Sequence, residues 1–324
     1  MKGFWKNKKV LITGYEGFLG SNLTKKLIGF GADIIGLDIL VNRKTTLLRK
    51  DDYRKIKVVK GSVADFKLVK KIIRQNRIGV IFHLAAEALV GNCLANPLKA
   101  FSSNIEGTWN VLEATRTFKS VQAIVIASSD KAYGSHEKLP YNEDFCLQGD
   151  HPYDVSKSCA DLLAYTYFNT YKTPVSITRC GNIYGPGDFN FSRIVPDAIK
   201  CALSNKTLAI RSDGKFTRDY VFVDDIVNGY ILLAEKLFKN PKLSGEAFNF
   251  SYERPLSVLE LVKKIYRLSG REPKYKILDQ AKFEIKDQYL SSKKARMTLQ
   301  WKPRLTLDKG LKGTLDWYKG LFTK

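Results

Sequence analysis

The stretch VLITGYEGFLGSNL, Val10 to Leu23, decides the fold that we predict for this chain. It begins as a short apolar run typical of a buried strand and ends in a pattern typical of an amphipathic helix. Between them, Gly14, Gly17 and Gly20 follow a GxxGxxG spacing. A glycine turn between a strand and a helix directs backbone N–H groups and the helix N-terminus at a pyrophosphate. The stretch therefore predicts the first turn of a dinucleotide-binding unit.

An acidic residue at the end of the next predicted strand supports this interpretation. The run DIIGLD ends at Asp38, 24 residues after Gly14. A carboxylate at this place accepts hydrogen bonds from the adenosine ribose hydroxyls and repels a 2′-phosphate. The sequence therefore favours NAD over NADP as the cofactor, although the cations Arg43 and Lys44 lie nearby.

Apolar runs and amphipathic stretches alternate through the first half of the chain. The predicted strands cover residues 8–14, 33–38, 56–62, 79–86, 121–129 and 174–185, and the predicted helices cover 19–31, 65–76, 104–118 and 152–172. This alternation implies right-handed crossovers between parallel strands. The predicted fold class is α/β, with a Rossmann-type doubly wound parallel sheet and a smaller C-terminal α/β substrate domain.

The alternation loosens after Tyr184, where a Gly-Pro-Gly-Asp turn follows. We predict an NAD-binding Rossmann domain over residues 1–179, to which a segment near 219–250 returns. Residues 180–324 form mostly the second, substrate-binding domain in this prediction.

The composition of the 324 residues is that of a soluble globular protein, with 44% hydrophobic and 27% charged residues. No apolar segment reaches the ~20 residues that span a bilayer. Five scattered cysteines without a CxxC pair, and only three histidines, argue against a disulfide framework and a metal site and favour the cytoplasm. The net charge of +22 is spread along the chain, so nucleic acid is not favoured as a partner, and a phosphate-bearing ligand benefits from the same field.

A YxxxK pattern at Tyr153 and Lys157 places a phenol and an ammonium one helical turn apart. The ammonium is expected to lower the pKa of the phenol, so that Tyr153 takes a proton from a substrate hydroxyl. Ser129, at the end of the predicted strand 121–129, is expected to hydrogen-bond the same substrate oxygen. The same spacing at Tyr53 and Lys57 is interpreted as chance. Tyr133, the competing phenol, has no lysine four residues later and is interpreted as a packing residue.

Asp130 and Lys131 follow Ser129 at this strand end, where charged side chains are costly to bury unless they are paired or used. Together, the glycine turn, Asp38 and the segments FHLAA, SNIEGT, SSDKAYG, YDVSK, RCGNIYGPGD and RDYVFVDD resemble the extended short-chain dehydrogenase/reductase family. The relevant branch is the NAD-dependent sugar-nucleotide epimerases and dehydratases. Within it, Ser129-Asp130-Lys131 is most similar to the matching segment of CDP-glucose 4,6-dehydratases.

The resemblance implies an NAD-dependent 4,6-dehydratase that converts a nucleotide-diphosphate hexose to its 4-keto-6-deoxy form. Tyr153 would remove the C4 hydroxyl proton as a hydride leaves C4 for NAD. Lys131 would then remove the proton at C5, and Asp130 would protonate the departing 6-hydroxyl. The hydride would return to C6, so that NAD is recycled.

The resemblance also assigns binding residues and a homodimer. The implied cofactor contacts, besides the glycines, Asp38, Tyr153 and Lys157, are Phe18, Leu19, Ser62, Val63, Leu84, Ala85, Ala86 and Asn104. The implied substrate contacts are Asn182, Arg193 and Arg218, the arginines because a guanidinium fork suits a diphosphate. Leu19 stands where CDP-glucose dehydratases carry a lysine, and Ser62 stands where the family has an aspartate.

Two other functions remain open at this point. In a 4-epimerase of UDP- or GDP-sugars, Asp130 and Lys131 would form a structural ion pair. A non-catalytic, basic dinucleotide- or RNA-binding protein is the remote alternative, and it would not need Ser129, Tyr153 and Lys157 together.

Overall fold

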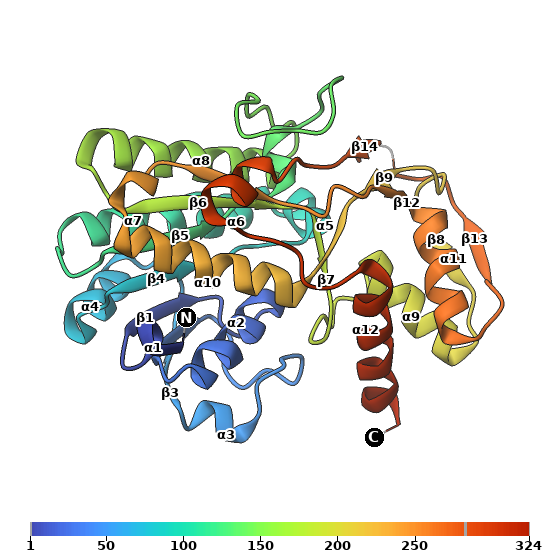
Figure 1. Ribbon diagram of the computed structural model, residues 1–324, viewed down its shortest axis with the longest axis horizontal. Coiled ribbons are helices and arrows are strands. Elements are labelled where there is room, and N and C mark those ends of the chain that lie inside the picture. Colours follow the sequence, from blue (N-terminus) through green and yellow to red (C-terminus); the bar gives the residue numbers. More distant parts are fainter. Residues whose placement is uncertain (1, 282–283, 324) are drawn as a thin grey trace.

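The computed structural model describes residues 2–281 and 284–323, and its main feature is one parallel sheet of seven strands (Figure 1). Their order is β3-β2-β1-β4-β5-β6-β11. The bounds are β1 (Lys9–Thr13), β2 (Asp33–Asp38), β3 (Ile56–Lys60), β4 (Val80–His83), β5 (Ala123–Ala127), β6 (Val175–Cys180) and β11 (Ala247–Phe250). The predicted doubly wound parallel sheet is confirmed.

The central strands are apolar on both faces because helices cover both sides of the sheet. Successive side chains of β1 point to opposite faces. Val10 and Ile12 therefore join one hydrophobic cluster, with Leu23 of the helix α2, whereas Leu11 joins a second cluster, with Val111 of α7. Figure 1 shows the helices that make up these two layers.

The first face carries α1 (Lys2–Trp5), α2 (Phe18–Gly29) and α10 (Val223–Lys239). The second face carries α4 (Phe66–Asn76), α7 (Gly107–Arg116) and α8 (Pro152–Tyr171). The short helices between them are α3 (Lys50–Tyr53), α5 (Val90–Ala95), α6 (Pro97–Phe101), the π-helical turn η1 (Ser102–Glu106) and the 3₁₀ helix η2 (Asp130–Tyr133). No helix within residues 2–281 and 284–323 has the length and apolarity that crossing a membrane requires.

The strand order reverses at β1, which lies between β2 and β4. From β1 the chain continues through β2 to β3 at one edge of the sheet, and it then crosses back to β4 and continues toward the other edge. The connections that follow β1 and β4 therefore run in opposite directions. In open α/β sheets, ligands bind at the carboxyl ends of the strands beside such a switch point. Thr13 and His83 end the two strands here.

A third hydrophobic cluster organises the C-terminal elements at one end of the molecule (Figure 1). It contains side chains of α9 (Ile194–Ser204), α11 (Val258–Ser269) and α12 (Leu307–Phe322). The short strands there are β7 (Asn182–Tyr184), β8 (Leu208–Ile210), β9 (Thr217–Arg218), β10 (Tyr220–Phe222), β12 (Leu256–Ser257), β13 (Tyr275–Ile277) and β14 (Asp287–Gln288). Two irregular helices, η3 (Pro241–Leu243) and η4 (Ala295–Leu299), complete the described chain.

The single strand predicted over residues 174–185 was wrong, because it is divided at Gly181. β6 stays in the large sheet, whereas β7 leaves it and pairs with β10. A Cβ on Gly181 would lie 3.0 Å from the Asp219 carbonyl oxygen, so the two chain segments approach each other closely here.

Candidate active site

The glycine turn brings the end of β1, the start of α2 and the end of β4 into close backbone contact. Gly14 has a positive φ of 74°, and a Cβ there would lie 2.7 Å from the Ala85 backbone nitrogen. A Cβ on Gly20 would lie 2.0 Å from the Gly14 carbonyl oxygen. In the described chain, no side chain caps α2 at Gly17. The turn therefore keeps backbone N–H groups at the helix start for an anion, which fits a pyrophosphate.

Replacing Gly20 with Ala is expected to destabilise the folded chain by about 1–3 kcal/mol, because the added methyl group overlaps backbone that must move. Urea unfolding followed by circular dichroism measures this free energy. Gly29→Ala is the matched control on the same helix, because a Cβ at Gly29 meets nothing within 4 Å. Equal stability of the two variants would contradict the close packing of the turn.

Asp38 ends β2 at the edge of the glycine turn and is only 9% exposed. Its carboxylate accepts hydrogen bonds from the backbone nitrogens of Glu16, at 3.2 Å, and Leu40, at 3.1 Å. Burial raises the pKa of Asp38, and these hydrogen bonds and the charge of Arg43 act in the opposite direction. The carboxylate keeps free lone pairs beside the turn, as recognition of a ribose diol requires.

The sequence analysis missed Glu16, which lies inside the glycine motif and is fully buried. Its carboxylate accepts hydrogen bonds from the Asn42 backbone nitrogen, at 2.9 Å, and from the Tyr53 hydroxyl, at 2.8 Å. Glu16 thus ties the loop after β2 to the glycine turn. Tyr53 and Lys57 have unrelated partners, since the Lys57 ammonium donates to the Asn76 side chain.

A buried histidine joins the ends of β1 and β4. His83 Nδ1 lies 2.8 Å from the Thr13 hydroxyl oxygen, and its Nε2 lies 3.2 Å from the Thr108 hydroxyl oxygen. Burial, with a smaller effect from the charge of Lys157, lowers the pKa of His83 to about 3. The Thr13 hydroxyl also accepts hydrogen bonds from the backbone nitrogens of Leu84 and Ala85, both at 3.2 Å. A neutral histidine therefore fixes the backbone against which Gly14 packs.

Asn104 lies in the π-helical turn η1, and its amide is used within the protein. Its Oδ1 accepts a hydrogen bond from the Glu87 backbone nitrogen at 2.7 Å, and its Nδ2 donates to the Ser156 hydroxyl at 2.9 Å. At the end of β3, Val63 is buried, and the Ser62 hydroxyl accepts a hydrogen bond from the Ala64 nitrogen. Cofactor contacts of Asn104, Ser62, Val63, Phe18, Leu19 and Ala86 stay predictions.

Tyr153, Lys157 and Ser129 converge at the junction of β5 and α8. The Ser129 side chain hydrogen-bonds the Tyr153 side chain. The Lys157 ammonium donates to the Ala127 carbonyl oxygen at 2.8 Å and lies 6.0 Å from the centre of the Tyr153 ring. Burial lowers the pKa of Lys157 to about 8. A phenol, a hydroxyl and a cation thus meet where the parallel strands end.

The expectation that Lys157 lowers the pKa of Tyr153 was wrong for the protein by itself. Burial of the phenol raises its pKa to about 12, and the charge of Asp130 adds to this increase. The Ser129 hydrogen bond and the charge of Arg193 act in the opposite direction without compensating it. The physical reason is that removing a phenolate from water costs more than one hydrogen bond returns.

Asp130 begins η2 directly after Ser129 and is 4% exposed. Its carboxylate accepts a hydrogen bond from the Ser129 hydroxyl at 2.9 Å, and burial raises its pKa. The charge of Lys131 acts in the opposite direction on Asp130 and on Asp154, a buried acid that the sequence analysis missed. Lys131 therefore lies near two carboxyl groups, those of Asp130 and Asp154.

The arginines predicted to bind a diphosphate have different surroundings. Arg193 precedes α9, donates to Asp188 at 3.2 Å and lies 5.9 Å from the Phe18 ring centre, near the glycine turn. Arg218 is buried and donates to the carbonyl oxygens of Thr217, Ile285 and Lys286. Arg193 is thus the more available cation, and Asn182 lies half-buried on β7.

Comparisons with known proteins agree with this geometry. The family described as GDP-mannose 4,6 dehydratase matches residues 11–314. CDP-glucose 4,6-dehydratase of Salmonella typhimurium is 30% identical, over 98% of this chain and 92% of its own. UDP-glucuronate 4-epimerase of Thermodesulfobacterium geofontis is 31% identical, over 95% of both chains.

A solved structure adds a cofactor-bound relative. The dTDP-glucose 4,6-dehydratase of Bacillus anthracis in complex with NAD superposes with a TM-score of 0.86, at 26% identity over 97% of each chain. These relatives include both dehydratases and an epimerase, so the similarity identifies the family and leaves the reaction to the site residues. The chain belongs to the GDP-mannose 4,6 dehydratase family of sugar-nucleotide dehydratases and epimerases, within the extended short-chain dehydrogenases/reductases.

Proposed function

We propose that this protein is an NAD-dependent sugar-nucleotide 4,6-dehydratase, with CDP-glucose as the first substrate to test. The observation that supports the dehydratase reaction is the buried Asp130, whose raised pKa favours the protonated carboxyl beside Ser129 and Tyr153. Elimination of water from C6 needs such a proton donor, whereas hydride exchange at C4 does not. The similarity to a CDP-glucose 4,6-dehydratase supports the choice of nucleotide.

The site fits NAD as the cofactor. The glycine cradle, which a Cβ would fill, suits a pyrophosphate, and the Asp38 carboxylate suits an unphosphorylated ribose. When bound, NAD supplies a positively charged hydride acceptor that is regenerated by the end of the reaction. The positive charge of bound NAD would lower the pKa of Tyr153 and so oppose part of the increase that burial causes.

Asp38→Ala is expected to shift cofactor preference toward NADP by removing the group that repels a 2′-phosphate. Loss of a ribose hydrogen bond to a charged group should weaken NAD binding about tenfold or more. Titration calorimetry with NAD and NADP measures both affinities. Asp33→Ala, at the exposed start of the same strand, is the control. An unchanged ratio of the two affinities would place the ribose elsewhere.

The chain's own residues account for each proton transfer in the proposed reaction. Tyr153 takes the proton of the sugar C4 hydroxyl, while Ser129 hydrogen-bonds the same oxygen. The resulting ketone acidifies the proton at C5, and we assign its removal to Lys131. Lys131 takes this proton as a neutral amine and holds it until C5 is protonated again. Asp130 protonates the leaving 6-hydroxyl, and a proton then returns to C5.

An NDP-sugar 4-epimerase is the second candidate, and the surroundings of Lys131 favour it. Two carboxyl groups, those of Asp130 and Asp154, lie within electrostatic reach of this side chain, a surrounding that suits a structural role. One experiment separates the two reactions. Purified protein is incubated with NAD and, separately, with CDP-glucose, UDP-glucose, GDP-mannose and dTDP-glucose.

Mass spectrometry of each mixture reads the outcome. A product lighter by one water establishes dehydration and names the nucleotide. A product of unchanged mass with altered stereochemistry at C4 by NMR makes the protein an epimerase and overturns the proposed role of Asp130. No reaction with any of the four sugars would overturn CDP-glucose as the substrate.

A further inference from the structure

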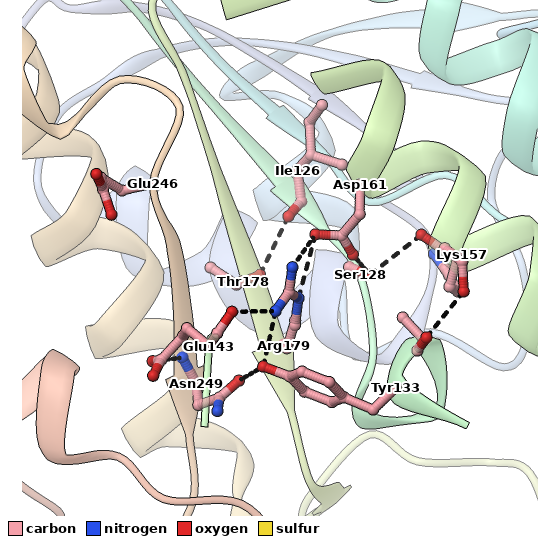
Figure 2. A network of polar contacts seen from close by, with 12 residues as sticks. Ile126, Ser128, Tyr133, Glu143, Lys157, Asp161, Thr178, Arg179, Glu246 and Asn249 are labelled. Carbon is pink, nitrogen blue, oxygen red and sulfur yellow. Dashed lines mark hydrogen bonds and ion pairs between the residues drawn. The ribbon is translucent and has the colours of Figure 1, made fainter. Parts of the chain in front are cut away.

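A buried ion pair lies behind the catalytic turn, between β6 and α8 (Figure 2). Arg179 Nε and Nη2 donate to one carboxylate oxygen of Asp161, at 3.1 and 2.9 Å. The Arg179 and Asp161 side chains are only 7% and 2% exposed. Burying two charges is costly unless each of their polar atoms has a partner, so a pair kept at this depth needs further contacts.

Those further contacts reach both ends of the turn that carries Ser129, Asp130 and Lys131. Before the turn, the Ser128 hydroxyl donates to the second Asp161 carboxylate oxygen. After it, Arg179 Nη1 donates to the Tyr133 hydroxyl at 2.7 Å, with the guanidinium carbon 4.7 Å from the centre of the Tyr133 ring. Figure 2 shows Ser128 beside the Asp161 carboxylate and Tyr133 beside the Arg179 guanidinium.

The network extends from Tyr133 to the last strand of the sheet. The Tyr133 hydroxyl donates to Asn249 Oδ1 of β11 at 2.8 Å, and the Asn249 backbone nitrogen donates to the Glu143 carboxylate at 2.7 Å. The Arg179 guanidinium is therefore held between Asp161 of α8 and Tyr133 of η2, and the Tyr133 end is supported in turn by β11.

Asp161 also follows Lys157 by one helical turn on α8, so its charge acts on the ammonium. This charge raises the pKa of Lys157 and opposes part of the effect of burial. The other titratable groups that face Lys157 are Cys93 from α5, neutral His83 from β4 and Tyr153 from α8 itself. Among them, Asp161 has the largest influence in favour of the charged form.

We infer that Arg179 and Asp161 are a positioning pair: they lock the Ser129–Lys131 turn onto the helix that carries Tyr153 and Lys157, and they place a carboxylate one helical turn from Lys157. This inference rests on the proposed function for its effect on turnover, but its electrostatic part is a property of the protein alone. Arg179 and Asp161 touch neither reacting atoms nor the glycine turn. They act through Lys157 and through the turn.

The first test reads the ionisation of Lys157 without any substrate. Protein labelled with ¹³C-lysine is titrated by NMR, and the Lys157 signal is assigned as the one missing from Lys157→Ala. Asp161→Asn removes the negative charge and should lower the pKa of Lys157 by about 1. Arg179→Gln removes the guanidinium that neutralises Asp161, so the negative charge acts more strongly on Lys157 and should raise that pKa.

The opposite signs separate this inference from a purely structural role. Loss of packing alone would lower the melting temperature of both variants without moving the pKa of Lys157 in opposite directions. Shifts of the same sign, or no shift in either variant, overturn the inference. Asp161→Glu and Arg179→Lys keep the charges and should keep the wild-type pKa of Lys157. If Asp161→Asn and Arg179→Gln fail to fold, a changed pKa of Lys157 in these two charge-preserving variants would overturn the inference.

The second test uses turnover. Asp161→Asn should move the alkaline fall of kcat/KM to lower pH by the same amount as the pKa, because activity is lost as Lys157 loses its proton. The change in the KM for the substrate should be small compared with the change in kcat. Arg296→Gln, which breaks the half-exposed ion pair with Glu253, is the matched control. A pKa shift without turnover on any sugar nucleotide would reject the proposed function and keep the electrostatic inference.

Discussion

Tyr153→Phe is expected to lower kcat/KM about 10²–10⁴-fold, because the variant keeps the ring and loses the group that takes the C4 hydroxyl proton. The Ser129 hydroxyl loses its contact with the phenol but keeps its hydrogen bond to Asp130, and the ring still fills its place beside Lys157. Binding of NAD and the melting temperature should therefore stay close to the wild-type values. Initial rates with the sugar nucleotide identified by mass spectrometry measure the effect.

Tyr165→Phe is the matched control, since Tyr165 lies on the same helix and is 55% exposed. It should retain wild-type rates. If Tyr153→Phe were equally active, the proton would have to leave through another group, and Tyr153 would be an ordinary aromatic residue at a helix start. A variant that lost NAD binding as well would show that the ring holds the cofactor, and the rate alone would then not report on proton transfer.

Asp130→Asn is expected to reduce release of water at least 10²-fold, because an amide cannot give a proton to the departing hydroxyl. Oxidation at C4 does not use Asp130, so the variant should still form enzyme-bound NADH after mixing with substrate. Rapid-mixing absorbance detects the NADH, and mass spectrometry detects the missing dehydration. An epimerase would instead keep its product, and this result would contradict the dehydratase assignment.

The pH dependence of the wild-type dehydration rate tests the role of Asp130 a second time. A general acid works while it is protonated, so dehydration should decline as pH rises through the raised pKa of Asp130. Asp144→Asn is the control for the loss of one carboxylate, since Asp144 is exposed on the loop after η2. It should leave the rate and its pH profile unchanged.

Short-range features of the sequence predicted most of the fold. The strand, the glycine turn and the helix start at residues 10–23 are determined by neighbours in the chain: apolar periodicity, backbone freedom at Gly14, and the space that Gly20 leaves empty. The carboxylate at the end of the next strand is a short-range signal as well. Such patterns depend on contacts within one βαβ unit, and a single sequence displays them.

The missed features involve partners distant in sequence. Nothing near residue 179 in the chain indicates that Arg179 bonds to Asp161 and Tyr133, because three elements must first pack together. The division of the predicted strand at Gly181 likewise depends on Asp219.

The sequence by itself determined which chemical groups this protein possesses: a glycine turn, an acid at the end of the next strand, a tyrosine–lysine pair, and a serine, an acid and a lysine after a strand. Only the tertiary structure decided their ionisation. Burial raises the pKa of Tyr153 and Asp130 and lowers that of Lys157 and His83, in each case toward the neutral form. The reason is physical: the cost of removing a charge from water depends on everything packed around it, and most of those neighbours are distant in the chain.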